Sequence, residues 1–533
     1  MTKTNVTGDE ALVWGALKNK TSYIAGHTGI FSQLAAELPQ SVPLRIHHCL
    51  DGKVCLEQAI GASYANHRSV LYLKSPEFSQ SLFSLHLASL HEIYAGIIVI
   101  VQDDPGAWHE QTEQDSRSNI ATLHLPLFEP SSPQEGYDMI AEAFRISETF
   151  LLPVVIRITT SYVIMKSNIE IRDSLLQIDK AEISEKKWLS RPNVAVGNQE
   201  ALLKKVEKIE SVLEKTPFNQ VIGTGSTQII VSGQVYAKLS EVIGNRIEKE
   251  YNILKIGALY PPPIHKIKNI LEDAEKVLVL EETDSYIENV VRETAQSNNL
   301  WIPVWGRKTG HVPKSGELFK WQIEDIMMKF KPGFTSAGFF FPYQEKKDLI
   351  DAAKLCFGCP YYSIFNDIKE VCESFPDGEE PIFIGDPGCP ARLAEPPYEM
   401  IKIVNSPGSA IGIASGVARF QDDRRIVAVT DDVSFFHGGL NNLLEAGFNF
   451  ADIVVLILDT SYVRKEKAGM TEDPEQQVMT DISIEELILS CHVNFHKVID
   501  EPQFSEIKSV FKRAIDNSGL SVIVIKNICS LIS

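Results

Sequence analysis

The chain is 533 residues long and carries 51 basic against 70 acidic side chains, a formal net charge of −19. This balance argues against nucleic acid or an anionic membrane as the main partner, because both repel an acidic protein. At roughly 150 residues per domain, the length predicts three or four domains. The longest apolar runs are only strand-sized, and the polar N-terminus lacks an apolar signal segment, so we expect a cytoplasmic enzyme.

Apolar strand-like runs alternate with helical patterns along the chain, which is typical of α/β proteins built on parallel sheets. Within the first part we expect strands at residues 69–73, 96–101 and 153–158 and a helix at 134–149. Together these elements predict a first α/β domain over residues 1–165.

A connector rich in lysine and glutamate follows at residues 166–217. Its apolar residues recur at helical spacing, which predicts an amphipathic helix. These residues are Leu202, Val206, Ile209 and Leu213. A second α/β domain is expected at residues 218–302. Its expected strands are at 228–233, 253–257 and 276–282.

Residues 303–345 are rich in Gly, Pro and Phe and show little regular pattern, so we expect a linker there. The last domain is expected at residues 346–533. Its expected strands are at 381–385, 425–429, 453–458 and 521–525. The fold class is therefore predicted to be α/β, with several doubly wound parallel-sheet domains.

The clearest chemistry lies where two of these strands end. Asp431 and Asp432 follow the strand at 425–429, and Thr460 comes directly after the next strand along the chain. In open α/β sheets, ligands bind at the carboxyl ends of the strands. A carboxylate and a hydroxyl from neighbouring strand ends suit Mg²⁺ shared with a diphosphate. The alternative is that the two aspartates only cap the following helix.

The segment from Asp431 to Gly439 reads Asp-Asp-Val-Ser-Phe-Phe-His-Gly-Gly. It resembles the thiamine diphosphate (TPP) and Mg²⁺ motif of the 2-oxoacid:ferredoxin oxidoreductase family, and in particular of the alpha (large) subunits of indolepyruvate ferredoxin oxidoreductases. Further similar motifs lie at residues 59–64, 103–117, 127–135, 232–233, 260–263 and 280–282. The resemblance implies a pyrimidine-binding-like domain at residues 1–165 and a diphosphate- and Mg-binding-like domain at residues 346–533.

The resemblance also implies which residues hold the metal and the cofactor. The side chains of Asp432 and Thr460 and the main-chain carbonyl of Tyr462 would hold Mg²⁺, and Gly438 would contact the cofactor. Oxygen is the ligand atom in all three metal positions, as Mg²⁺ prefers.

Two residues are candidates for catalytic contacts. Thr28 matches a threonine that touches the substrate end of the cofactor in similar enzymes, and His437 lies in the Phe-Phe-His pattern beside the metal motif. The alternatives are that Thr28 is a turn residue and that His437 is hydrogen-bonded within its own loop.

Four cysteines resemble the ligands of the [4Fe–4S] cluster nearest to TPP in the family. They are Cys356, Cys359, Cys389 and Cys529. Thiolates suit such a cluster, while a Cys₄ zinc site or four unrelated buried thiols are the alternatives. Eight cysteines are too few for a disulfide scaffold, and the other four are expected to be buried packing residues. These four are Cys49, Cys55, Cys372 and Cys491.

Three features depart from the family pattern. The glutamate that activates TPP, through a carboxyl group that binds the aminopyrimidine ring, corresponds to Gly52. Asp51 is the neighbouring carboxylate, and Glu57 is expected to face elsewhere because it lies about 140° around a helix. The glycine before the metal aspartate is Asp431 here, whose negative charge would lie near the diphosphate. The indolepyruvate enzymes continue into a ferredoxin-like domain, whereas this sequence stops at Ser533, so electrons are expected to leave through a separate protein.

The function implied by the resemblance is that of a TPP- and Mg-dependent 2-oxoacid oxidoreductase subunit of the arylpyruvate or branched-chain type. It would decarboxylate the 2-oxoacid and pass electrons through one [4Fe–4S] cluster to ferredoxin or another acceptor. A homodimer is expected, with a smaller partner subunit. The departures leave two alternatives: a non-oxidative TPP-dependent decarboxylase or carboligase, and a subunit of the same fold that no longer binds TPP.

Overall fold

The chain divides into two compact units, Met1–Tyr343 and Gln344–Ser533. The structure is a computed structural model. It describes residues 2–26, 44–49, 51–108, 112–172, 192–340, 359, 361–421, 423–460 and 483–526. Among these residues, no helix combines the length and the apolar character that crossing a bilayer requires.

A seven-stranded sheet forms the centre of the first unit, with the order β12-β6-β7-β5-β4-β2-β3. Its strands are β2 (Tyr23–Gly26), β3 (Arg45–His48), β4 (Ser69–Lys74), β5 (Ile97–Asp103), β6 (Leu127–Phe128), β7 (Val154–Thr159) and β12 (Ala258–Tyr260). All pairings are parallel except that of β12 with β6. The central strands are apolar on both faces, as a sheet covered on both sides requires.

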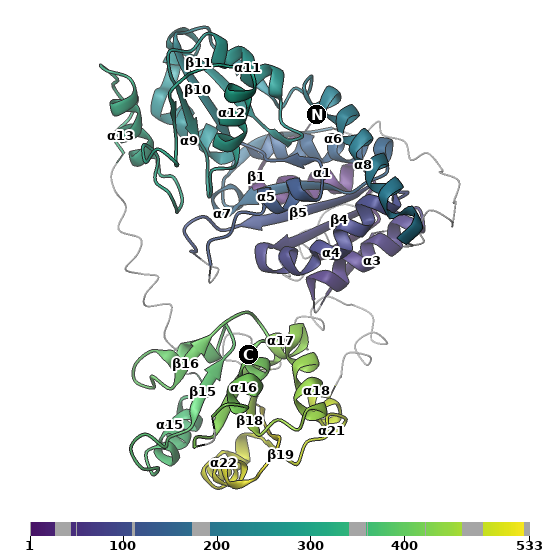
Figure 1. The fold of residues 1–533 in the computed structure, drawn as a ribbon, viewed down its shortest axis with the longest axis vertical. Coiled ribbons are helices and arrows are strands. Elements are labelled where there is room, and N and C mark those ends of the chain that lie inside the picture. Colours follow the sequence, from purple (N-terminus) through teal and green to yellow (C-terminus); the bar gives the residue numbers. More distant parts are fainter. Residues whose placement is uncertain are drawn as a thin grey trace. The chain divides into compact units, whose positions relative to one another are not determined.

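Helices cover both faces of this sheet. Helices α3 (Gly52–Tyr64) and α4 (Ser75–His91) pack together, as do α1 (Gly8–Lys18) and α6 (Pro133–Phe150). In Figure 1 the two pairs lie on opposite faces of β4 and β5. This is the arrangement that right-handed crossovers produce when the chain first winds one way and then reverses.

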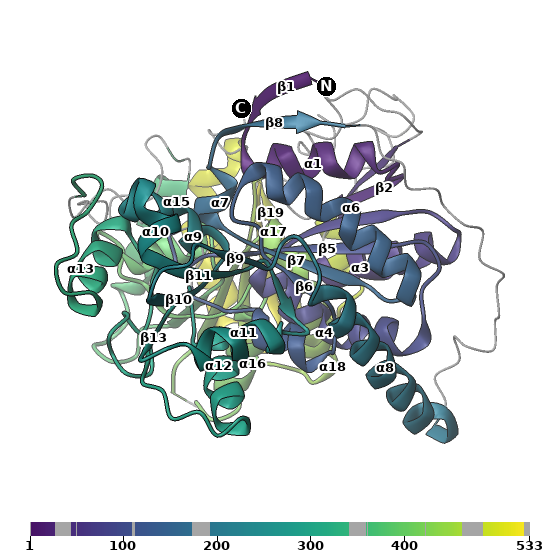
Figure 2. The ribbon, with the colours of Figure 1, turned by 90° about the horizontal axis from the view of Figure 1, so that it is seen from above.

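Shorter elements complete this part of the unit. They are β1 (Thr2–Val6), α5 (Arg117–Thr122), α7 (Thr160–Val163), β8 (Ser167–Ile171) and α8 (Pro192–Leu213). Strands β1 and β8 pair antiparallel, and Figure 2 shows them as a ribbon beside α1. The amphipathic helix predicted in the connector is α8, which buries Leu202, Ile209 and Leu213 against the first core.

A five-stranded sheet, ordered β14-β13-β10-β11-β9, forms the rest of the first unit. Its strands are β9 (Gln220–Ile222), β10 (Thr227–Ser232), β11 (Tyr251–Ile256), β13 (Val277–Leu280) and β14 (Val304–Trp305). Its helices are α9 (Gly233–Ile243), η2 (Gly244–Arg246), α10 (Ile247–Glu250), α11 (Ile264–Glu272), α12 (Tyr286–Ser297) and α13 (Lys320–Phe330). Regular structure therefore extends into the expected linker, because α13 buries Ile323, Met327 and Phe330 in a core that it shares with α9.

The second unit is built on one six-stranded, fully parallel sheet, ordered β16-β15-β17-β18-β20-β19. Its strands are β15 (Ile382–Gly385), β16 (Ile401–Val404), β17 (Ile426–Asp431), β18 (Ile453–Asp459), β19 (Phe495–Ile499) and β20 (Ser521–Lys526). Helices α15 (Tyr361–Cys372) and α22 (Ile507–Asp516) pack together, as do α16 (Ala410–Ala418) and α18 (Leu440–Phe448). The short elements are η3 (Pro390–Ala394), α17 (Asp432–Ser434), η4 (Phe435–Gly439), α21 (Ile484–Leu489) and η5 (Glu501–Glu506).

The large sheets of the two units are wound in the same order. The spatial orders of their parallel strands are β3-β2-β4-β5-β7-β6 and β16-β15-β17-β18-β20-β19. In each sheet, the strand that comes first in the chain lies between the second and the third. The parallel strand that comes last in the chain lies inside the one before it, which is the outermost parallel strand on that side. The winding therefore reverses between β2 and β4 in one sheet and between β15 and β17 in the other. These two reversals are the points at which doubly wound sheets bind ligands. The predicted fold class, α/β with doubly wound parallel sheets, is confirmed.

Candidate functional site

Acidic residues gather at the carboxyl edge of the second unit's sheet. Asp386 follows β15, Asp431 and Asp432 end β17 and begin the next turn, and Asp459 ends β18. All four are buried, with side chains less than a tenth exposed. Burying several carboxylates at one sheet edge is unfavourable without partners, so such a cluster marks a candidate cation or ligand site.

Asp432 and Thr460, the two side chains predicted to hold Mg²⁺, contact each other directly. Thr460 Oγ1 donates a hydrogen bond to Asp432 Oδ1 at 2.6 Å, and the Thr460 amide lies 3.3 Å from the same oxygen. The parallel register of β17 and β18 pairs Asp431 with Leu458, which places the residues after each strand side by side. The paired carboxylate and hydroxyl oxygens fit a hard cation such as Mg²⁺. Tyr462 lies outside the described residues.

The Asp431 side chain has different neighbours from Asp432. Its Oδ1 accepts a hydrogen bond from the Ser434 amide at 2.8 Å, so Asp431 does cap the following turn. Its Oδ2 lies 2.8 Å from where a Cβ on Gly388 would stand, in the loop after β15. Burial raises the pKa of Asp431 to about 7, and the charges of Asp432 and Asp386 add to this effect.

Asp386 lies at the same sheet edge, at the end of β15. The winding of the sheet reverses between β15 and β17, so Asp386 and Asp431 lie on opposite sides of that reversal. Its Oδ1 accepts a hydrogen bond from the Ala410 amide at 2.8 Å, at the start of α16. Its Oδ2 is buried without a hydrogen-bond partner among the described residues, and burial raises the pKa of this carboxyl to about 6. A buried, under-coordinated carboxylate oxygen is unfavourable on its own, which is consistent with a binding edge.

His437 and Gly438 lie in the π-helical turn η4, directly after α17. The turn is thus at the same sheet edge as Asp432, and the His437 side chain is buried. Gly408 approaches the turn so closely that a Cβ on it would stand 2.7 Å from the Gly438 Cα, and its φ is +78°. Both facts require glycine at 408. Short π-helical segments often occur at functional sites.

Two of the four predicted cluster ligands lie near one buried tyrosine of the second unit. Cys359 precedes α15, Cys389 follows β15, and both pack against the same apolar core. Burial raises the pKa of Tyr361 far above its usual range, and the nearby charges of Asp432, Cys389, Asp459 and Cys359 raise it further. The tyrosine thus lies close both to the acidic edge and to the two cysteines.

The other predicted ligands, Cys356 and Cys529, and the candidate Thr28 lie outside the described residues. Within the part of the chain that the structure describes, no three His, Cys, Asp or Glu side chains are grouped as ligands of one metal ion. Cys491 is buried and Cys372 is half-buried, and burial raises the pKa of the Cys372 thiol to about 12.

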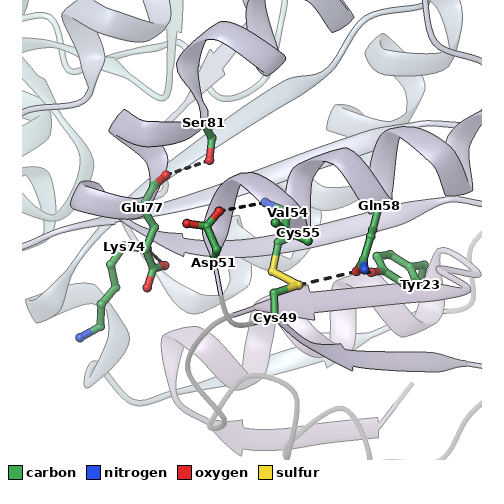
Figure 3. The surroundings of a disulfide bond; sticks show 9 residues. All are labelled: Tyr23, Cys49, Asp51, Val54, Cys55, Gln58, Lys74, Glu77 and Ser81. Carbon is green, nitrogen blue, oxygen red and sulfur yellow. Dashed lines mark hydrogen bonds between the residues drawn. A yellow bond between two sulfur atoms is a disulfide. The ribbon is translucent and has the colours of Figure 1, made fainter. Parts of the chain in front are cut away.

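Cys49 and Cys55 form a disulfide at the carboxyl edge of the first unit's sheet, with Cα atoms 5.5 Å apart (Figure 3). We expected both to be separate packing residues. Both are buried, but they are also bonded, because the turn between β3 and α3 brings them together over six residues. The disulfide encloses Asp51 and Gly52.

The carboxylates near Gly52 have different roles. Asp51 is the N-cap of α3 and accepts a hydrogen bond from the Val54 amide at 3.1 Å. Glu57 is half-exposed, pairs with Lys53 at 2.6 Å and faces away, as its position around the helix predicts. Sequence reasoning missed Glu77, the third residue of α4, which lies against Gly52. The available signal was its position just after a buried strand.

Asp103, Asp115, Arg117 and Glu129 come from two segments that carry part of the resemblance, and they take part in a buried ionic network. Arg157 donates to Asp103 at 2.6 Å, to Glu129 at 2.9 Å and to Thr283 at 3.1 Å, and all four side chains are buried. A second buried arginine completes the network. Arg117 pairs with Asp115 at 2.5 Å and with Glu281 at 2.9 Å. The network joins the two sheets of the first unit.

Comparisons with known proteins agree with the geometry of the second unit. The family described as "Thiamine pyrophosphate enzyme, C-terminal TPP binding domain" matches residues 386–525, which include Asp386, Asp432 and Thr460. This supports TPP as the cofactor.

Known sequences extend the likeness to the whole chain. Indolepyruvate oxidoreductase subunit IorA of Methanothermobacter thermautotrophicus is 27% identical over 99% of this chain and 87% of its own length. The subunit of the same name from Pyrococcus horikoshii is 27% identical over 99% and 86%. Among solved structures, a 2-oxoglutarate:ferredoxin oxidoreductase from Magnetococcus marinus superposes with a TM-score of 0.47 at 14% identity, over 61% of this chain and 65% of that one. The resemblance predicted from the motifs is confirmed by the sequence comparisons, since the similar proteins are named as oxidoreductase subunits and the matched family is a TPP-binding one.

Proposed function

We propose that the chain is the TPP- and Mg²⁺-dependent subunit of a 2-oxoacid oxidoreductase, acting on an arylpyruvate or a branched-chain 2-oxoacid. The observation that carries the proposal is the 2.6 Å contact between Thr460 and Asp432 at two neighbouring strand ends, inside the matched TPP-binding domain. The names of the similar archaeal proteins support an oxidoreductase over other TPP-dependent reactions.

Each predicted site residue would have its own role in binding. Asp432 and Thr460, with the carbonyl of Tyr462, would hold Mg²⁺, and the backbone at Gly438 would face the diphosphate. His437, in the same turn, and Thr28 would contact the substrate end. TPP, when bound, supplies the carbon nucleophile and the electron sink that decarboxylation of a 2-oxoacid needs. The protein would hold and orient both TPP and the 2-oxoacid.

The electrons would leave through one [4Fe–4S] cluster on Cys356, Cys359, Cys389 and Cys529. The closeness of Cys359 and Cys389 to Tyr361, and of Tyr361 to Asp432, supports a cluster next to the cofactor site. Four thiolates are the usual ligand set of such a cluster. Ferredoxin or another protein would then accept the electrons.

The proposal includes an assembly. IorA is named as a subunit in the similar proteins, which supports a smaller partner subunit for this chain too. We further propose a homodimeric core and a cytoplasmic location.

Native mass spectrometry of anaerobically purified protein tests the cofactors. After reconstitution with iron and sulfide, the expected result is one Fe₄S₄ mass increment per chain and one TPP with Mg²⁺. Asp432→Ala should remove only the TPP increment, and Cys389→Ala only the cluster. Cys491→Ala is the matched control, since Cys491 packs in a different core from Cys389. Zinc in place of iron, or a cluster that survives Cys389→Ala, would contradict the cluster.

A second candidate function rests on a specific observation. Asp386 and Asp431 add two buried carboxyls at the edge where a diphosphate would bind, and this favours a subunit that no longer binds TPP. Folded chains that take up no TPP in the same mass-spectrometry experiment would support a subunit that no longer binds TPP. If TPP binds, product analysis separates the oxidoreductase from a non-oxidative decarboxylase or carboligase, which forms aldehyde or acyloin without an electron acceptor.

A further inference from the structure

We propose that Glu77 is the catalytic carboxylate that contacts the aminopyrimidine ring of TPP, in place of the glutamate that is absent at position 52. The inference rests on the proposed function, because it requires that TPP binds. It assigns a residue that no sequence motif had singled out.

The first support is the contact between the two helix starts. Gly52 is the first residue of α3, and a Cβ built on it would stand 2.7 Å from the Cβ of Glu77, the third residue of α4. Side chains at both positions would collide, so only one of the two can carry a side chain. The volume that a side chain at 52 would enter is therefore bordered by the Cβ of Glu77.

The second support is the topology of the sheet. Helix α4 follows β4, and the winding of the first sheet reverses between β2 and β4. The equivalent strand of the second sheet is β17, and the residues at its end are Asp431 and Asp432. Glu77, in the first helical turn after β4, thus lies near the same end of its strand as Asp432 does after β17, beside the winding reversal of its own sheet.

The third support is the state of the Glu77 side chain. It is only 6% exposed, and its Oε2 accepts a hydrogen bond from the Lys74 amide at 3.0 Å, which fixes the carboxylate at the sheet edge (Figure 3). A glutamine would cap the helix equally well without burying a charge, so capping alone gives no reason for a carboxylate. The other two carboxylates nearby are engaged elsewhere: Asp51 caps α3, and Glu57 pairs with Lys53 on the outside.

The role assigned to Glu77 is to hold a proton at a ring nitrogen of the TPP aminopyrimidine. The Glu77 carboxyl would share a proton with N1′ of the aminopyrimidine, which favours loss of a proton from the 4′-amino group. The 4′-amino proton would pass to water, and the nitrogen that released it would then be able to accept the thiazolium C2 proton. Glu77 and water would thus account for every proton moved.

Exchange of the C2 proton of bound TPP in D₂O, followed by proton NMR after an acid quench, measures this step without substrate, cluster or acceptor. Glu77→Gln keeps the cap and the volume, so it should bind TPP as the wild type does while exchange falls by about 100-fold. Asp51→Asn and Glu57→Gln are matched controls and should leave exchange unchanged. Unchanged exchange in Glu77→Gln, or a comparable loss in Asp51→Asn, would overturn the assignment.

Swapping the residues at positions 52 and 77 gives a second, independent test. Gly52→Glu alone should lose TPP binding because the new side chain collides with Glu77. Gly52→Glu combined with Glu77→Gly removes the collision and restores a carboxylate, so C2 exchange should recover well above that of Glu77→Gly. A double variant that binds TPP but exchanges no faster than Glu77→Gly would contradict the proposal. If wild-type protein binds no TPP in calorimetry, the proposed function itself fails, and this outcome is distinct from unchanged exchange in Glu77→Gln.

Discussion

Thr460 donates a 2.6 Å hydrogen bond to Asp432, although 28 residues separate them in the chain. The contact exists because β17 and β18 are neighbouring parallel strands that end at the same level. A carboxylate and a hydroxyl are thereby held together before any cation binds. Cation binding therefore costs less conformational entropy at these two side chains.

Removing the hydroxyl of Thr460 should weaken binding of Mg²⁺ and TPP. Thr460→Val keeps the shape but offers no oxygen, and the expected loss of Mg²⁺-dependent TPP affinity is about 10- to 100-fold. Calorimetric titration of TPP at fixed Mg²⁺ measures it. Thr460→Ser, which keeps the oxygen, should stay close to wild type. Equal affinity in the Val and Ser variants would argue against Thr460 as a ligand.

Removing the charge of Asp431 should tighten TPP binding. Asp431→Asn can still cap the Ser434 amide but no longer repels a diphosphate. At pH 8, above the Asp431 pKa of about 7, we expect about fivefold higher affinity, the effect of one unit charge a few ångströms away in a water-like dielectric. The exposed Asp377→Asn is the control for net charge. Weaker binding in Asp431→Asn would show that the carboxylate supports the site.

Removing the Arg157 side chain should strongly destabilise the first unit. Arg157→Met leaves Asp103 and Glu129 buried without their cation, and the expected loss in the free energy of unfolding is about 3–5 kcal/mol. Arg145→Met, which breaks the partly exposed pair with Glu142, should cost less than about 1 kcal/mol.

Tryptophan fluorescence during urea unfolding makes this comparison selective, because all six tryptophans lie within residues 1–343. Similar losses for Arg157→Met and Arg145→Met would mean that the buried network contributes little to stability.

Glu281 should make the first unit less stable as the pH rises. Burial raises its pKa from 4.5 to about 7, despite its pairing with Arg117. Between these values the folded state keeps a proton that the unfolded state has lost, so this residue's contribution to stability is largest below pH 4.5 and falls by about 3 kcal/mol as the pH rises to 7.

Glu281→Gln cannot titrate, and its free energy of unfolding should fall less than that of the wild type between pH 5 and pH 8. Urea unfolding at four pH values, followed by tryptophan fluorescence, measures the two slopes. Parallel slopes would place the Glu281 pKa near its ordinary value.

The buried strands could be read from the sequence because a covered parallel strand must be apolar on both faces. The runs at 69–73, 96–101 and 453–458 are such strands and became β4, β5 and β18. Strands as short as β6 and β14 left no such run. They form only because a neighbouring strand offers hydrogen bonds.

Helix α13 and the disulfide likewise could not be predicted from the local sequence pattern. The Gly, Pro and Phe content around residues 303–345 concealed the apolar face of α13, which is stabilised by packing against α9. The pairing of Cys49 with Cys55 depends on how β3 leads into α3, a geometry that spacing alone does not specify.

The sequence by itself determined the class of fold, the alternation of buried strands with helices, and the acidic strand ends that resemble a TPP motif, because each of these is a local pattern. Only the tertiary structure decided which side chains meet. Asp432 meets Thr460 through strand order. Glu77 lies against Gly52, 25 residues earlier in the chain, because the starts of two helices pack together. Such contacts depend on sheet winding and helix packing, and these arise from the summed burial of the whole core rather than from any one segment.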